Sequence, residues 1–198
     1  MKRISSIIFC LLLLFSCGKG KNTSQLTDSN PYRTGISDPS DSTLNNPSEA
    51  LEVQIPMSNE QLKEWIPEKI GEMEQRKLIV GHKQGMEMSG AVATYEDKGH
   101  KEKQISMEVL DGAGAIGAVM LKSISQKLIL DYEEKMPNGY SKIYERDGVR
   151  VWERFNSLDH SADIEYVTRG RFHFIFKGHQ IEMEELWGFV REVQEAMN

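Results

Sequence analysis

The spacing of apolar residues divides residues 51–198 into helical and extended segments. The sequence SNEQ, which starts at Ser58, is typical of a capping box, in which a Ser and a Gln satisfy the free N–H groups at a helix start. Apolar residues continue at helical spacing to Met73, with a break at Pro67. The pattern therefore predicts a first helix that is interrupted or restarts at this proline.

Alternating apolar and polar residues predict two groups of strands. The first group covers approximately 76–82, 87–95 and 102–110, and the second covers 140–146, 149–155, 161–168 and 171–177. A second helix, over 115–134, separates the groups, and a third helix closes the chain with one apolar face. That face consists of Met183, Leu186, Trp187, Val190, Val193 and Met197.

Short strands joined by tight turns are antiparallel. The order α-βββ-α-ββββ-α thus predicts an α+β domain, with a mainly antiparallel sheet of about seven strands and three helices packed on it. This order, with LKEWIPEKIGEM, AVATYED, ISMEVLDGAG and the YSKIY…GVRVWERFN…RFHFIF ladder, resembles small exported bacterial proteins of unknown function. Their architecture resembles the PsbP-like α/β/α sandwich, named for the extrinsic protein of the photosynthetic oxygen-evolving complex. The resemblance implies a binding or accessory module and transfers no catalytic residues.

The beginning of the chain has the pattern of an export signal. Two basic residues precede an apolar run from Ile4 to Phe15, which is too short to span a bilayer comfortably. The sequence LFSC, which ends at Cys17, resembles the lipobox of bacterial lipoproteins. This resemblance implies that residues 1–16 are a signal peptide that is removed and that Cys17 carries lipid. An ordinary cleaved signal with an incidental cysteine is the alternative.

Residues 17–50 consist of this cysteine and a segment that is rich in Ser, Asn, Thr, Gly, Asp and Pro and has no helical or strand period. We therefore expect a disordered tether, followed by a globular domain over 51–198. Gly-Lys-Gly-Lys follows Cys17 directly, whereas acidic residues at this place act as sorting or surface-export signals in some lipoprotein systems. Their absence favours a periplasm-facing outer-membrane location where the host has two membranes.

Composition restricts the chemistry of the mature chain. The second cysteine, Cys10, lies in the apolar run and leaves with it, so thiol catalysis and cysteine metal sites are excluded. The net charge is −6, and it becomes more negative when the signal with its two basic residues is removed. An acidic protein of this kind has no electrostatic reason to bind nucleic acid.

Gly112, Gly114 and Gly117 have the spacing of a dinucleotide-binding turn. Such a turn follows a buried parallel strand with a continuous apolar run, but residues 104–109 alternate between polar and apolar. The required acidic residue falls near Asp131, inside the predicted second helix. We therefore interpret the glycines as a tight strand-to-helix turn with close packing, and we expect no nucleotide and no other cofactor.

Other candidate groups are isolated. Asp159 and His160, with Asp163, are candidates for part of a metal site, but the segment NSLDHSAD is more typical of a solvated hairpin loop. Glu133 and Glu134 are adjacent carboxylates that do not share a helix face, so we interpret them as an exposed helix end. We predict neither a metal site nor a catalytic residue.

The turn Asp147-Gly148 sets the register of one hairpin, because this dipeptide favours a two-residue loop. Counting outward places an expected core set on one face, namely Tyr140, Tyr144, Val149, Val151 and Phe155. The opposite face pairs Ile143 with Trp152, Glu145 with Arg150, and Ser141 with Arg154.

The next hairpin requires a choice of loop length. A three-residue loop that begins at Thr168 puts Ile164 and Tyr166 on the same face as three phenylalanines. A two-residue loop would instead set the phenylalanines against acidic residues, so we predict the longer loop. Glu165 and His173 then point away from the core.

Trp152, flanked by Arg150 and Arg154, forms with His173 a predicted partner-binding face, because Trp and Arg are enriched at interface hot spots. The alternative is that the first helix covers this face and Trp152 belongs to the core. The sequence thus favours a membrane-anchored envelope lipoprotein that acts as a binding or accessory module, for an envelope protein or a small ligand. A hydrolase-like envelope enzyme with a carboxylate and histidine site is the second hypothesis.

Overall fold

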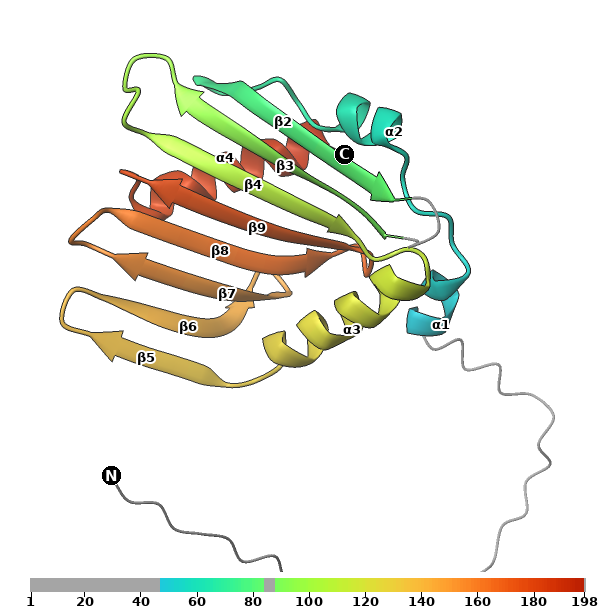
Figure 1. Ribbon diagram of the computed structural model, residues 1–198. Helices are drawn as coiled ribbons and strands as arrows, with labels where there is room; N and C mark the ends of the chain where they lie inside the picture. Colours follow the sequence, from blue (N-terminus) through green and yellow to red (C-terminus); the bar gives the residue numbers. More distant parts are fainter. Residues whose placement is uncertain (1–46, 84–87, 198) are drawn as a thin grey trace, which may run out of the picture. The chain divides into compact units, whose positions relative to one another are not determined.

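The computed structural model describes residues 47–83 and 88–197 (Figure 1). Its strands are β1 (Lys69–Ile70), β2 (Met73–Lys83), β3 (Met88–Asp97), β4 (Gln104–Asp111), β5 (Tyr132–Met136), β6 (Gly139–Arg146), β7 (Val149–Asn156), β8 (Ser161–Thr168) and β9 (Phe172–His179). Its helices are α1 (Pro47–Glu52), α2 (Asn59–Trp65), α3 (Ala115–Leu128) and α4 (Met183–Ala196). The predicted α+β class is confirmed, but the described residues contain nine strands and four helices, more than the sequence predicted.

All strands belong to one antiparallel sheet with the order β1-β2-β3-β4-β9-β8-β7-β6-β5. After β4 the chain crosses to the opposite edge through α3 and returns strand by strand to β9, which lies beside β4. In Figure 1, α3 lies before the sheet and α4 lies behind it. The two helices therefore cover opposite faces.

The helix that was predicted to start after Ser58 is α2, and it is shorter than predicted. Its capping box is confirmed, because the Ser58 hydroxyl accepts from Gln61 N at 3.2 Å while Ser58 N donates to the Gln61 side chain at 2.8 Å. The helix ends at Trp65, and Met73 begins a strand instead of continuing the helix. The residue before a proline is sterically disfavoured in the helical conformation, and Pro67 therefore ends the helix.

The second predicted helix was also too long. α3 ends at Leu128, and β5 pairs with β6 along the edge of the sheet. The interpretation of Glu133 and Glu134 as a helix end is therefore wrong: both are exposed residues of an edge strand. Arg150 from β7 caps the carbonyl groups at the end of α3: its guanidinium donates to Leu128 O at 3.1 Å and to Leu130 O at 2.8 Å.

At the other end of the described chain, α1 begins at Pro47, before the domain start predicted at residue 51. Leu51 of this helix packs against Ala118 and Leu121 of α3. The predictions for the signal peptide, for Cys17 and for most of the tether lie outside the described residues.

The main core lies between the sheet and α4. The predicted apolar face of α4 is confirmed, because all six of its residues are buried. The face of the β8–β9 hairpin is also confirmed: Ile164 lies opposite Phe176 and Tyr166 opposite Phe174. The loop itself is one residue further along than predicted, because Thr168 pairs with Phe172.

The predicted register of β6 and β7 is confirmed, with Ile143 opposite Trp152. Asp147 and Gly148 take the left-handed conformation that this turn requires, with φ of 52° and 78°. The core face of this hairpin also carries Glu153, a charged residue that the apolar pattern does not assign to the core.

Glu153 is a buried carboxylate that is held by aromatic donors. The hydroxyls of Tyr140 and Tyr144 donate to it at 2.7 and 2.8 Å, and Trp187 Nε1 of α4 donates at 2.8 Å. Burial opposes ionisation, but these hydrogen bonds and the nearby Lys142 outweigh it and lower the pKa of Glu153. The charge is therefore compensated inside the core.

A second buried carboxylate, Asp111, joins three parts of the chain where β4 ends. Arg171 donates to both of its oxygens at 2.7 Å, Met57 N donates at 2.8 Å and Ala113 N at 3.0 Å. Burial opposes ionisation here too, and the donors, Arg171 first, outweigh it and lower the pKa of Asp111. This carboxylate connects the segment before α2, the start of α3 and the β8–β9 loop.

The three motif glycines allow α3 to start immediately after this carboxylate. A Cβ atom at Gly117 would lie 2.7 Å from Asp111 O, and one at Gly112 would lie 2.7 Å from Arg171 O. Gly114 has a φ of 81° at the N-cap of α3. Because β4 is antiparallel to both neighbours, the motif does not follow a parallel strand. The interpretation as a closely packed strand-to-helix turn is confirmed.

We predict that Gly117→Ala lowers the free energy of unfolding by about 1–3 kcal/mol, because the new methyl group meets backbone atoms that have little room to shift. Gly81→Ala is the matched control, since a Cβ there meets no atom within 4 Å. Urea unfolding measures both. Equal stability of the two variants would contradict the steric role of Gly117.

Candidate functional site

The predicted partner-binding residues lie on the sheet face that carries α3. Trp152 is the centre of a row of paired residues across β5 to β9, formed by Tyr132, Ile143, Trp152, Glu165 and Ile175. The alternative in which the first helix covers Trp152 is not what the structure has, because Leu62 of α2 packs into the core on the α4 side. Instead, α3 covers part of the row and leaves Trp152 half-buried.

A pocket of about 450 Å³ lies between the end of α3 and strands β5 to β7. The Trp152 ring lines it, and Trp152 Nε1 donates to Ser141 Oγ at 2.9 Å, which fixes the ring plane. Lys127 of α3 places its ammonium group 5.3 Å from the centre of the ring. Arg154 places its guanidinium 5.8 Å from the same ring. The pocket thus offers an aromatic surface between two cations.

Both cations already have partners inside the fold. Arg154 contacts Asp163 at 2.7 Å through Nε and at 2.5 Å through a terminal nitrogen. Lys127 contacts Glu165 at 2.5 Å. The cations are therefore held in fixed positions, and the aromatic surface, rather than an unpaired charge, is the distinctive feature of the pocket.

His173 and Glu165 lie on the sheet face opposite the main core, as predicted, but α3 covers this face and buries both of them. His173 Nε2 is 3.0 Å from Glu165 Oε1. Burial raises the pKa of Glu165, but the hydrogen bonds from His173 and Lys127 outweigh this and hold it below its ordinary value. The sequence did not reveal this burial, because it depends on the path of α3 across the sheet.

Among the predicted site residues, Trp152 and Arg154 line the pocket. Arg150 instead supports the end of α3 through the two carbonyl contacts described above. His173 lies beneath α3 with Glu165 and does not line this pocket. The structure adds Lys127, Ser141 and Tyr132 to the site, none of which the sequence analysis selected. The hairpin register would have placed Ser141, whereas Lys127 and Tyr132 depend on α3 and β5.

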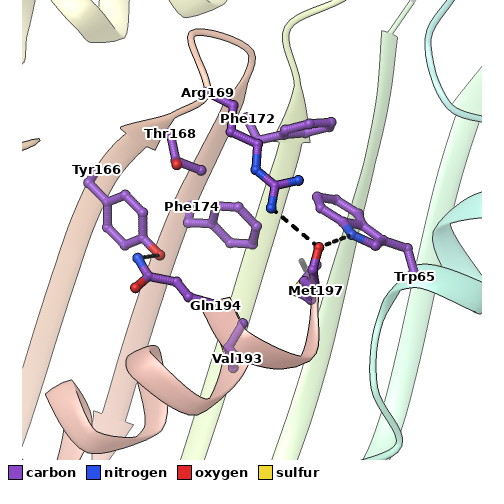
Figure 2. A pocket seen from close by; sticks show the side chains of 9 residues that line it. All are labelled: Trp65, Tyr166, Thr168, Arg169, Phe172, Phe174, Val193, Gln194 and Met197. Atoms are coloured by element: carbon purple, nitrogen blue, oxygen red, sulfur yellow. Dashed lines mark hydrogen bonds between the residues drawn. The ribbon is translucent and has the colours of Figure 1, made fainter.

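A smaller pocket of about 240 Å³ lies at the end of α4, on the core side of the sheet (Figure 2). It is lined by Trp65, Phe172 and Phe174, and the Trp65 and Phe172 rings are 4.7 Å apart. Met197 O accepts from Trp65 Nε1 at 3.1 Å and from Arg169 at 3.5 Å. It is smaller than the Trp152 pocket, and its Tyr166 hydroxyl accepts from Gln194 at 3.1 Å.

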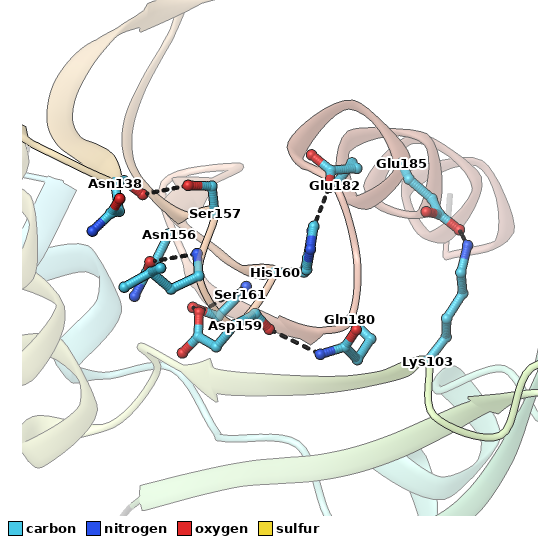
Figure 3. Close-up of polar contacts among 11 residues, drawn as sticks. Lys103, Asn138, Asn156, Ser157, Asp159, His160, Ser161, Gln180, Glu182 and Glu185 are labelled. Carbon is cyan, nitrogen blue, oxygen red and sulfur yellow. Dashed lines mark hydrogen bonds and ion pairs between the residues drawn. The ribbon is translucent and has the colours of Figure 1, made fainter.

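The residues considered for a metal site are dispersed. His160 Nδ1 lies 2.7 Å from Glu182, and the Asp159 carboxylate accepts from Ser161 (Figure 3). Asp163 pairs with Arg154 on another face of the hairpin. Within residues 47–83 and 88–197, no three His, Cys, Asp or Glu side chains form a group that could hold a metal ion.

Comparisons of the chain with protein-family models, with curated proteins and with solved structures found no match. Within the part of the chain that the structure describes, no helix is both long enough and apolar enough to cross a bilayer.

We predict that Glu165 contributes to the pH dependence of stability. Its pKa is lower in the folded than in the unfolded state, so its contribution is full above about pH 5 and is lost as the pH falls through the folded-state pKa. Glu165→Gln should therefore be less stable at neutral pH and lose less stability on acidification than the wild type.

Urea unfolding at a series of pH values from neutral to about pH 3 measures this difference. The control is Glu133→Gln, which changes an exposed carboxylate of β5. If Glu165→Gln and the wild type lose equal stability over this range, the assigned role of Glu165 is wrong.

Proposed function

We propose that this protein is a lipid-anchored envelope protein whose globular domain is a binding module, and that the Trp152 pocket is its ligand site. The observation that carries the proposal is the half-buried Trp152 ring, which is fixed by Ser141 and flanked by Lys127 and Arg154 in a pocket of about 450 Å³. Half-buried tryptophan and arginine are typical of binding hot spots, because they combine a large apolar area with polar groups at its rim.

The geometry favours a ligand that presents a flat apolar group to Trp152. Lys127 and Arg154 are each paired with a buried carboxylate, so a ligand need not neutralise them. An aromatic side chain of an envelope protein or a small aromatic ligand would fit this chemistry. Ser141, Tyr132 and Glu134 also line the pocket, where the Tyr132 hydroxyl donates to Glu134 at 2.7 Å and Ser141 accepts from Trp152.

The LFSC sequence supports anchoring through lipid on Cys17, and the Gly-Lys-Gly-Lys that follows supports a periplasm-facing place on the outer membrane. The arrangement of α3 and α4 on opposite sheet faces supports the PsbP-like α/β/α sandwich as the fold family. The proposed lipid anchor and the proposed fold family both agree with a module that holds its ligand close to a membrane.

Site-specific photocrosslinking in intact cells tests the binding site. A benzoylphenylalanine at Tyr132, which lines the pocket and is partly exposed, should give a discrete adduct that weakens or disappears in Trp152→Ala. The same probe at Leu158, an exposed residue of the β7–β8 turn, is the matched control and should not give this adduct. An adduct that is unchanged by Trp152→Ala would refute the proposed site.

Stability separates loss of the site from loss of the fold. Trp187 is buried and donates to Glu153, so Trp187→Ala should cost about 3–5 kcal/mol. Trp152 is half-buried, and Trp152→Ala should cost clearly less. If the two substitutions prove equally destabilising in urea, Trp152 is a core residue rather than a binding residue.

A hydrolase-like enzyme is the second candidate, and one observation favours it. The paired His173 and Glu165 resemble a base and its orienting carboxylate, and His173 lines a separate apolar groove of about 450 Å³ together with Met120 and Ile124 of α3. Assays with activated esters, amides and phosphates distinguish the candidates. Turnover that is lost in a folded His173→Gln variant would favour the enzyme, whereas the binding module predicts background rates for both proteins.

A further inference from the structure

The outer face of α3 exposes apolar side chains that nothing in the described fold covers. Ile116 and Val119 lie along its first two turns and are 38% and 61% exposed, whereas Met120 lies on the flank that borders the groove of His173. Ile129 and Leu130 follow directly after the helix and are 70% and 58% exposed. A surface helix of a soluble domain normally presents charged and polar residues on this side.

The charge of this helix differs from that of the rest of the protein. The sequence of α3, AIGAVMLKSISQKL, contains two lysines and no acidic residue. The whole chain has 30 acidic residues and a net charge of −6. Lys127 is paired with Glu165, which leaves Lys122 as the other cation of the helix. The apolar surface therefore lies beside a lysine, on a helix without acidic residues, a combination that suits the surface of an anionic bilayer.

The chain enters the fold beside this helix. α1 begins at Pro47 and packs on α3 through Leu51, and Gly114 N at the start of α3 donates to Leu51 O at 3.0 Å. The segment directly after α1 adds two more exposed apolar side chains, Val53 and Ile55. The chain therefore enters the domain at the end of α3 that carries Ile116 and Val119.

We propose that α3 lies on the surface of the membrane in which Cys17 is anchored, with Ile116 and Val119 in the interfacial layer. This inference rests on the proposed lipid anchor. The tether that the sequence predicts between Cys17 and Pro47 would, by random-coil scaling, have a reach of roughly 30 Å. A tether of this reach would keep the domain at a high effective concentration near the bilayer, so that a small apolar patch is sufficient for contact. The Trp152 pocket, which is lined by Lys127 and Leu130, then opens close to the lipid surface.

Quenching by brominated lipids tests this orientation with the full-length mature protein. Its only cysteine, Cys17, is blocked by lipid in the proposed form, so Val119→Cys introduces one reactive thiol for a fluorescent label. The matched control is Leu158→Cys, since Leu158 is also apolar and 73% exposed but lies in the β7–β8 turn, at the opposite end of the strands from Asp111. Both labelled proteins are placed in vesicles of phosphatidylethanolamine and phosphatidylglycerol with brominated acyl chains.

We expect severalfold stronger quenching at position 119 than at 158, and protection of position 119 from aqueous iodide. Equal quenching at both positions would overturn the orientation. Protection from iodide without quenching by brominated lipid would also overturn it, because a protein partner or a second copy would then cover α3. Intact mass separates the two proposals: a mature protein without acyl chains refutes the anchor itself, whereas an acylated protein with equal quenching refutes only the orientation.

Discussion

The ion pair between buried Asp111 and Arg171 fixes the point from which both faces of the sheet are covered. Asp111 is the last residue of β4, and α3 starts only a few residues later. The same carboxylate accepts from Met57 N and so holds the segment that leads to α2. A buried charge is tolerated only when it is paired and fully hydrogen-bonded, and these contacts satisfy that condition.

The course of α3 follows from this fixed start and from two further attachments. Lys127 forms an ion pair with Glu165 on β8, and Arg150 of β7 donates to the carbonyl groups at the end of the helix. The helix is thus held at its start, near its last turn and at its end. Because it crosses only part of the sheet face, it buries His173 and Glu165 and leaves Trp152 beside an open pocket.

The two proposals share this helix. Lys127, in the last turn of α3, borders the proposed ligand pocket, and the outer side of the helix carries the apolar residues proposed to meet the membrane. A ligand bound against Trp152 would therefore lie near the bilayer surface. This placement is consistent with a module that receives an envelope component or presents it to another protein.

The sequence by itself determined the elements whose causes are local. Ser58 and Gln61 specify a helix start through their own side chains, and Asp147-Gly148 specifies a turn that sets the register of Ile143 and Trp152. The apolar face of α4 follows from the helical period alone. In each case the decisive contacts join residues that are close in the chain or that repeat with the period of one element.

Only the tertiary structure decided which residues these elements would bury. The segment after Leu128 leaves the helix because β6 offers it a strand partner. Glu153 is satisfied by Trp187 from α4, and Glu165 by Lys127 from α3. The Trp152 pocket likewise depends on where α3 stops. These outcomes rest on partners far apart in the sequence, and neither period nor turn chemistry contains information about such partners.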